Sequence, residues 1–124
     1  MKSLKLLLML CAFPFISLAG DGVCNMKKAK KVFSKCAACH SVNKGGATIL
    51  GPNLFGVVGR ESGAVQSFPY SPALIDYKKT WTEAELHKFI ENPMKVVPGT
   101  MMAFRGLKKI EDRNAVICLL EENK

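Results

Sequence analysis

Cys36, Cys39 and His40 are the residues of this sequence whose types and spacing could do chemistry. Two cysteines three positions apart, followed at once by a histidine, form the pattern that attaches a c-type haem. At a helix end, each thiol can add to one of the two haem vinyl groups. The next residue then places a neutral imidazole, a common metal ligand, under the iron. The pattern therefore predicts one covalently bound haem with His40 as an axial ligand.

Two other uses of the same pattern fit this sequence less well. A thioredoxin-like redox pair needs a βαβ context, and no alternating strand pattern is present. A structural zinc site needs four ligands. Besides the pattern itself, the chain outside its N-terminal segment offers only Cys24, Cys118 and His87 for that purpose.

The N-terminal segment, residues 1–19, is predicted to be a secretory signal peptide. Lys2 and Lys5 precede an apolar run over residues 6–16, and small residues follow at 17–19. The run is shorter than the roughly 20 apolar residues that span a bilayer, although an uncleaved anchor is an alternative. One domain is expected over residues 20–124.

Capping residues and prolines in the sequence predict where the helices begin and end. Asn25 can cap a helix that runs to about Cys36, and Ser71-Pro72 can open a short one. Thr82 to Glu85 has the form of a capping box, and Asn92-Pro93 ends the helix that follows. A last helix starts near Ile110. The predicted class is all-α.

Two long connections, residues 41–70 and 93–109, show no helical pattern. Loops of this length are uncommon in a compact domain unless they have a function. The first carries several large apolar groups that need a surface to pack against: Ile49, Leu50, Leu54, Phe55, Val57, Val58 and Phe68. We expect these loops to wrap a flat prosthetic group, which would act as a second core.

The formal net charge of the whole chain is +8, and removal of the signal peptide would lower it by two. Nucleic-acid binding is one reading of such a charge, but few aromatic residues lie between the lysines and no nucleic-acid motif is present. Steering toward an acidic protein partner is the better interpretation.

The chain resembles the class I cytochrome c family, the mitochondrial type and its bacterial relatives. The resemblance runs from Lys30 to Leu120, and its segments lie at 32–40, 51–60, 70–73, 80–82, 91–93 and 97–104. It implies a small cytochrome c fold, with three to five short helices and long loops around one haem c. It also implies a soluble one-electron carrier, not an enzyme.

The resemblance also implies the second axial ligand. The family's ligand closes a Pro-Gly-Thr-x-Met run, which here ends at Met102, with Met101 as the alternative. Thioether ligation raises the reduction potential, as His/Met ligation does in this class. A peroxidase-like haem enzyme is the rival function, and it would need an open iron position and a distal acid or base. A subunit of a larger redox complex is a third possibility.

Further positions around the haem are implied by the same match. Pro52 resembles the residue whose carbonyl accepts a hydrogen bond from the axial imidazole. The groups that resemble partners of the haem propionates, which are costly to bury alone, are Arg60, Tyr70, Ser71, Trp81 and, for the second propionate, Thr100. Leu54, Ile90 and Phe104 would line the ring. Phe89 departs from the family, which usually has a tyrosine there that hydrogen-bonds the methionine sulfur.

The resemblance gives two expectations about the cell. The mitochondrial members lack a cleaved export signal, so residues 1–19 indicate a bacterial periplasm. The implied partners are a donor like quinol–cytochrome c reductase and a terminal oxidase or other acceptor. No small-molecule substrate and no nucleic acid are expected, and the protein should be a monomer.

Cys24 and Cys118 remain to be explained. The family packs its first and last helices crosswise, which would bring the two residues near each other, and free thiols tend to be oxidised in an exported chain. We expect a disulfide, and the alternative is two unrelated buried thiols.

Overall fold

A computed structural model describes residues 23–124, and the signal peptide prediction lies outside these described residues. Five helices follow one another: α1 (Met26–Ala37), α2 (Pro72–Tyr77), α3 (Glu83–Glu91), α4 (Pro93–Val96) and α5 (Ile110–Glu122). Residues 23–124 form no strand, only isolated bridges that join His40 to Thr48 and Glu61 to Thr80. The all-α prediction is therefore confirmed. None of the helices in this part of the chain has the length and apolar character needed to cross a membrane.

The helix starts follow from side chains that accept free backbone N–H groups. The Asn25 side chain accepts from Lys28 N, and Ser71 accepts from Leu74 N with Pro72 in the first turn. Thr82 accepts from Glu85 N, which is half of the predicted capping box. The other half does not form, because the Glu85 carboxylate accepts a hydrogen bond of 2.8 Å from the Tyr77 hydroxyl.

The segment after α3 differs from the prediction. Residues 93–109 were expected to form a loop, yet Pro93–Val96 form α4. Asn92 ends α3 and also caps α4, since its side chain accepts from Lys95 N at 3.3 Å. Proline is well suited to the first helical turn because it has no N–H to satisfy.

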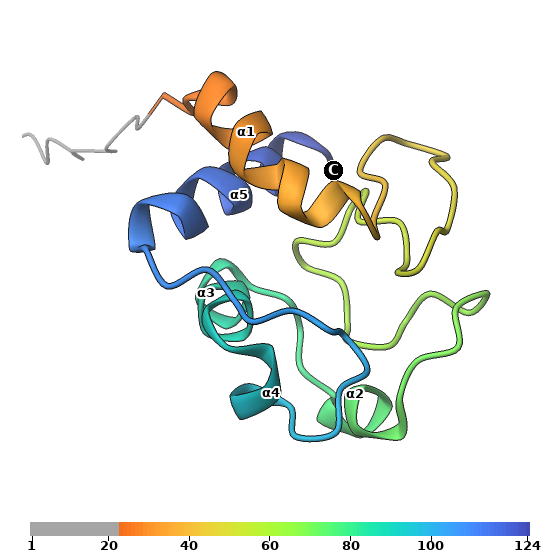
Figure 1. Cartoon of the computed structure of the whole chain (residues 1–124). Coiled ribbons are helices and arrows are strands. Elements are labelled where there is room, and N and C mark those ends of the chain that lie inside the picture. The colour runs from red at the N-terminus through yellow and green to blue at the C-terminus, as the bar shows by residue number, and fades with distance from the viewer. Residues whose placement is uncertain (1–22) are drawn as a thin grey trace, which may run out of the picture.

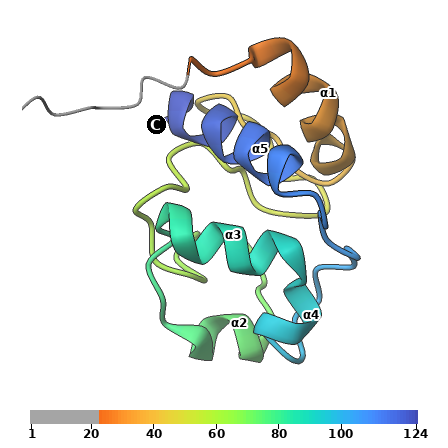
Figure 2. The ribbon, with the colours of Figure 1, turned by 90° about the vertical axis from the view of Figure 1, so that its left-hand side faces the viewer.

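The core joins the first and last helices, which are far apart in the sequence. α1 crosses over α5 at one end of the molecule, and α3 runs beneath them (Figures 1 and 2). Ala29 and Val32 of α1 are buried together with Val116 and Leu120 of α5. A disulfide between Cys24 and Cys118, with Cα atoms 5.9 Å apart, fastens the same pair of helices. The structure thus confirms the expected pairing of these two cysteines.

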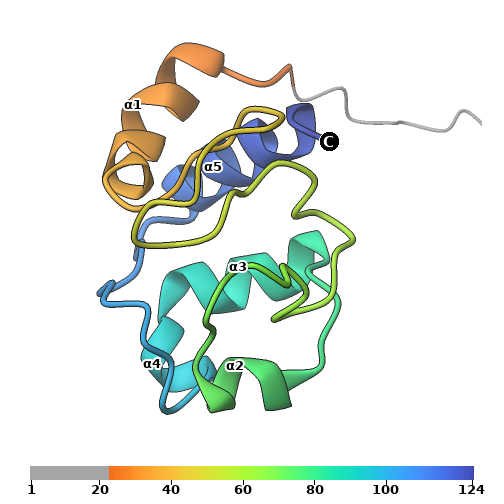
Figure 3. The ribbon, with the colours of Figure 1, turned by 90° about the vertical axis from the view of Figure 1, so that its right-hand side faces the viewer.

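The long loops form one face of the molecule, which extends from the α1–α5 pair to α2 (Figure 3). Residues 41–70 leave the end of α1, pass beside α5 and α3, and reach α2, as the yellow and green trace in Figure 3 shows. Asn53 organises the first part of this path. Its side-chain N–H₂ donates to Ser41 Oγ at 2.7 Å and to the Asn43 carbonyl at 2.9 Å. The loops and helices together enclose the cavity that contains the reactive residues.

Candidate functional site

One cavity of about 620 Å³ lies between the loops, α1, α3 and α5, and its lining is mainly apolar. That volume is typical of sites that hold a small molecule or cofactor. All twelve residues predicted to bind the haem or its iron line this cavity: Cys36, Cys39, His40, Pro52, Leu54, Arg60, Tyr70, Ser71, Trp81, Thr100, Met102 and Phe104. Their roles toward the haem remain predictions, but the fold brings residues from four separate segments to one place.

The attachment residues are positioned by the end of α1. Cys36 lies in the last turn, and the Cys39 and His40 amides both donate to the Cys36 carbonyl at 2.9 Å. This turn directs both cysteines and the imidazole into the same cavity. Burial raises the pKa of the Cys36 thiol to about 11, with Lys35 opposing the shift. A thiol with a raised pKa does not match the acidified cysteine of a thioredoxin-like pair.

His40 is held in the orientation and protonation state that an iron ligand needs. Its Nδ1–H donates to the Pro52 carbonyl at 2.7 Å, because a carbonyl oxygen can only accept. In the neutral ring the proton is therefore on Nδ1, and Nε2 keeps its lone pair for a metal. Burial lowers the pKa of His40, and the bond to Pro52 opposes that shift only in part. The imidazole is consequently neutral at neutral pH.

Gly51 makes this orientation possible, a function that the sequence analysis did not assign to it. A Cβ atom at Gly51 would overlap the His40 ring at Cε1 and lie 2.7 Å from Nδ1. The Gly51 amide also donates to the Cys39 carbonyl at 2.8 Å, so the backbone cannot easily move away. The sequence feature that could have indicated this function is the position of Gly51 directly before Pro52, where the loop returns to the attachment motif.

We expect Gly51→Ala to weaken the His40 site. The added methyl group must push the imidazole or the loop aside, which breaks the 2.7 Å bond to Pro52. Displacement of an axial ligand by even 1 Å costs binding strength, so the variant should show partial high-spin character in its visible spectrum. Gly45→Asn is the matched control: Gly45 lies in the same loop with a φ of +70°, a backbone conformation that asparagine tolerates, and a Cβ there meets nothing within 4 Å. Identical spectra for the Gly51 variant and the wild type would contradict this role.

The opposite wall carries Thr100, Met102 and Phe104. Thr100 is buried, and its Oγ1 accepts from Met102 N at 3.3 Å. The Phe104 amide donates to the Met102 carbonyl at 2.9 Å. These contacts fix the backbone on both sides of Met102, which is half-buried, whereas Met101 is 67% exposed. Both methionines line the cavity, but Met102 is the better enclosed.

The polar residues at the far side of the cavity have additional partners. Arg60 donates from Nη1 to the Phe55 carbonyl and from Nη2 to the Asn53 carbonyl, each at 3.1 Å. Arg60 therefore also holds the loop closed. Burial lowers the pKa of its guanidinium, and Tyr70 opposes that change. Ser71 is buried and uses its oxygen to cap α2, which leaves its O–H free to donate.

Aromatic packing joins α3 to this wall. Trp81 and Phe89 are buried with ring centroids 4.9 Å apart, and both line the cavity. Of the loop residues expected to pack on a prosthetic group, five line the cavity, namely Ile49, Leu50, Leu54, Val57 and Phe68. Phe55 and Val58 do not line it. Further lining residues come from three helices: Phe33 of α1, Leu86 of α3, and Val116 and Leu120 of α5.

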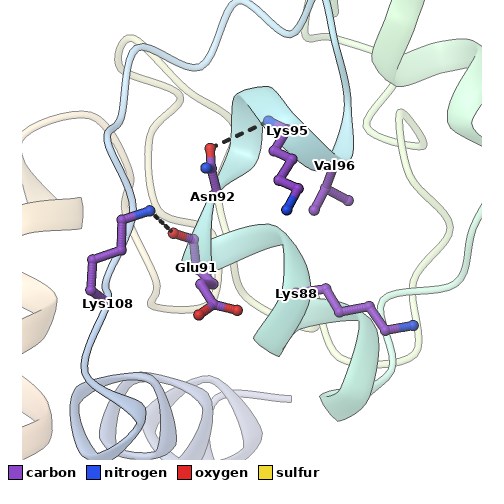
Figure 4. Close-up of a pocket in the computed structure, with 6 residues that line it drawn as sticks. All are labelled: Lys88, Glu91, Asn92, Lys95, Val96 and Lys108. Atoms are coloured by element: carbon purple, nitrogen blue, oxygen red, sulfur yellow. Dashed lines mark hydrogen bonds between the residues drawn. The ribbon is translucent and has the colours of Figure 1, made fainter.

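A second hollow of about 420 Å³ lies beside α4 and has a different character. Figure 4 shows its six lining residues, among them Lys88, Lys95 and Lys108. Lys108 Nζ donates to the Glu91 carbonyl at 2.7 Å, and Lys88 pairs with Glu85 at 3.6 Å. Two of the three lysines therefore already have partners. Residues 23–124 contain no group of three or more His, Cys, Asp or Glu side chains that could hold a metal ion.

His87 stays apart from the cavity. It is half-exposed on α3, and its Nε2 lies 3.9 Å from Glu83 one turn earlier. It is not among the lining residues. His87 therefore takes no part in this cavity.

Similar proteins place the chain in a family. A family model described as Cytochrome c matches residues 26–117. A cytochrome c of Arabidopsis thaliana is 43% identical over 108 residues, which cover 86% of this chain and 93% of that protein. A cytochrome c of Theileria parva is 46% identical over 96 residues (77% of this chain, 83% of that protein). One from Kluyveromyces lactis is 45% identical over 92 residues (73% and 84%).

These relatives overturn the predicted localisation. They come from a plant, a yeast and Theileria, and such eukaryotic cytochromes c sit in the mitochondrial intermembrane space. The prediction of a bacterial periplasm was therefore wrong. It rested on residues 1–19 alone, where a basic start and a short apolar run resemble an export signal. The domain itself, which carries the similarity, was not used for that inference.

The cavity and the comparisons together establish the cofactor and the general activity. The residues present fit a haem: two cysteines and an oriented imidazole at one wall, and an apolar cavity around them. The protein carries one covalently attached haem c and acts as an electron carrier with redox proteins as its partners, not as an enzyme. With a family model that matches 26–117 and relatives more than 40% identical, the chain belongs to the cytochrome c family.

Proposed function

We propose that this protein carries single electrons between respiratory redox proteins, with His40 and Met102 as the two axial ligands of a low-spin iron. The donor would be a protein like quinol–cytochrome c reductase, and the acceptor a terminal oxidase or another redox protein. The observation that carries the proposal is the cavity, because it brings both ligand candidates and both cysteines to one apolar site.

The chain supplies three things to such a carrier. The hydrogen bond from His40 to Pro52 holds the imidazole in place and makes it more basic. Thr100 and Phe104 fix the backbone of Met102 from both sides. Haem with His/Met ligation has a raised potential, and an apolar surrounding keeps water away from the iron. A site held in place in this way reorganises little when the iron changes charge.

The propionate partners are part of the same proposal. Arg60 would face one propionate with the N–H groups that the loop carbonyls do not use, and the Ser71 hydroxyl is free to donate. Tyr70 and Trp81 would add one donor each, and Thr100 would serve the second propionate. A buried carboxylate needs such donors, because an unpaired buried charge is costly.

A spectrum of the holoprotein tests the ligand set. After denaturation and acid extraction, the haem should stay with the chain, as the two cysteine attachments require. In the native protein, the reduced-minus-oxidised spectrum should be that of a low-spin haem in both states. A high-spin reduced form that binds carbon monoxide at once would contradict His/Met ligation and favour an open iron position.

Phe89 gives a prediction about the potential. It is buried, packs on Trp81 and lines the cavity with Met102. A tyrosine there could donate a hydrogen bond to the methionine sulfur, which would reduce the sulfur's electron donation to the iron and favour the ferrous state. A net hydrogen bond of about 0.5–1.5 kcal/mol corresponds to a few tens of millivolts, at about 59 mV per 1.4 kcal/mol for one electron. We expect Phe89→Tyr to raise the midpoint by that amount.

Potentiometric titration of the purified holoprotein measures this shift. Phe55→Tyr is the control, because Phe55 gains the same hydroxyl but does not line the cavity. An unchanged midpoint for Phe89→Tyr would show that the polarity around the methionine does not set the potential.

A further inference from the structure

The loop that carries Met102 begins and ends at the same place, the C-terminal end of α3. The chain leaves α3 at Glu91, passes through α4 and Met102, and returns at Leu107. There the Leu107 amide donates to the Ile90 carbonyl at 2.8 Å, and Lys108 Nζ donates to the Glu91 carbonyl at 2.7 Å (Figure 4). Both acceptors lie in the last turn of a helix, where carbonyls have no partner within the helix. We call these two hydrogen bonds the loop closure.

Gly106 lets the returning segment come close enough for the loop closure. Its φ is +91°, and a Cβ atom at this position would overlap the Glu91 carbonyl. Leu107, the next residue in the chain, is buried. A side chain at position 106 would therefore force the two backbones apart. The loop closure is thus a tight backbone contact that depends on a glycine.

Arg113 of α5 binds the same returning segment. Its side chain is buried, and Nη1 donates to the Leu107 carbonyl at 2.7 Å and to the Lys108 carbonyl at 2.9 Å. A carboxylate oxygen of Glu91 lies 3.6 Å from the same nitrogen, but the Glu91 side chain is half-exposed. A buried guanidinium that loses its acceptors is costly. Arg113 and residues 107–108 therefore hold one another in place.

We infer that Arg113 is a positioning residue for the second axial ligand, and that it acts by keeping the loop closure intact. The hydrogen bonds of Thr100 and Phe104 to the Met102 backbone fix the local shape of the loop, but they lie within it. The loop closure and Arg113 instead join the end of the loop to α3 and α5. The inference rests on the proposed His/Met ligation and adds the contact that keeps Met102 at the iron.

The distance along the chain makes this coupling direct. Residues 103–106 are the whole connection between Met102 and Leu107, so an outward movement of Met102 pulls on the loop closure. If residues 107–108 follow, the guanidinium of Arg113 loses both carbonyl acceptors. Hydrogen bonds to a charged group are the strong ones, so this loss opposes opening of the loop.

Competition with added imidazole tests the inference on the ferric holoprotein. Imidazole can bind the iron in place of Met102 only after the loop has opened, so its apparent affinity reports how often the loop opens. Loss of the visible absorption band of the iron–methionine bond follows the binding. We expect Arg113→Met, which keeps a long side chain but removes the donors, to raise the imidazole affinity by about tenfold. The Leu107 amide should also exchange faster with solvent deuterium.

Two controls separate positioning from a general loss of stability. Arg105→Met removes the same charge from an exposed position in the loop and should keep the wild-type imidazole affinity. Cys24→Ala/Cys118→Ala should lower the free energy of unfolding and leave the imidazole affinity unchanged, because the disulfide joins α1 to α5 outside the loop. If the double variant raised the affinity as much as Arg113→Met, imidazole binding would follow overall stability, and the inference would fail.

Lys108→Met takes the place of Arg113→Met if that variant does not fold. Lys108 is exposed, so its replacement leaves the core intact and removes one of the two hydrogen bonds of the loop closure. It should raise the imidazole affinity by a smaller factor than Arg113→Met. A wild-type affinity in Arg113→Met, or in Lys108→Met where Arg113→Met does not fold, overturns the inference.

The same titration separates this inference from the proposed function. If the wild-type protein has no band of an iron–methionine bond, the proposed ligation fails and the inference fails with it. If the band is present and imidazole removes it equally well in the wild type and in Arg113→Met, only the role of Arg113 is wrong.

Discussion

Met102→Ala should lower the reduction midpoint by on the order of 0.1 V or more and open the iron to carbon monoxide. Axial ligand identity moves haem potentials over a range of about 0.8 V, and a thioether favours the ferrous state. Met102 is half-buried with its backbone fixed by Thr100 and Phe104, so no other sulfur can easily take its place. Loss of this ligand should therefore appear in the spectrum, in the potential and in ligand binding together.

Met101→Ala is the control for this prediction. Met101 precedes Met102 directly and lines the same cavity, but it is 67% exposed. It should keep a midpoint close to that of the wild type and should not bind carbon monoxide. If Met101→Ala instead lowered the midpoint and bound carbon monoxide while Met102→Ala did neither, the second axial ligand would be Met101. The assignment of Met102 from the Pro-Gly-Thr-x-Met run would then be wrong.

Helix positions were predictable where the controlling contacts are local. Asn25, Ser71 and Thr82 each cap a helix through a backbone amide three residues away, so the sequence itself contains both partners. α4 was missed because four residues are too few for an apolar period. Asn92-Pro93 was interpreted only as a stop signal, but an Asn-Pro pair can end one helix and start the next.

Tertiary partners explain the rest of the differences. The Glu85 carboxylate binds the Tyr77 hydroxyl rather than its own helix, and no local pattern reveals such a competitor. Arg113 is another case. It is buried in α5 on the same face as Val116 and Ile117, where the sequence suggests an apolar residue. The structure explains it through hydrogen bonds from Nη1 to the Leu107 and Lys108 carbonyls, at 2.7 and 2.9 Å, although its Nε has no partner.

The residues of the candidate site could be predicted more fully than the paths of the loops that carry them. The attachment motif predicted three of these residues, and the resemblance predicted nine more, all of which line the same cavity. Gly51 was not assigned a function. Its importance depends on how closely its backbone approaches the His40 ring, and the spacing of residues in the sequence does not contain that distance.

The second large effect concerns the disulfide between Cys24 and Cys118. Cys24 lies just before α1 and Cys118 lies within α5, 94 positions later. Closing a loop of this size restricts the unfolded chain strongly, and we expect the Cys24→Ala/Cys118→Ala variant to lose on the order of 4–5 kcal/mol of unfolding free energy. The variant should still fold, because Ala29, Val32, Val116 and Leu120 keep the α1–α5 contact buried.

Denaturant unfolding of the holoprotein, followed by helical circular dichroism, measures this loss. The covalent haem stays attached in every variant, so the comparison isolates the cross-link. Wild-type protein in a reducing buffer should match the double variant, which checks that the effect comes from the bond and not from the side chains. Thiol counting on the denatured, unreduced wild type should find the same number of free thiols as in the double variant. Two additional free thiols in the wild type, together with equal unfolding free energies for wild type and variant, would show that Cys24 and Cys118 are unrelated buried residues.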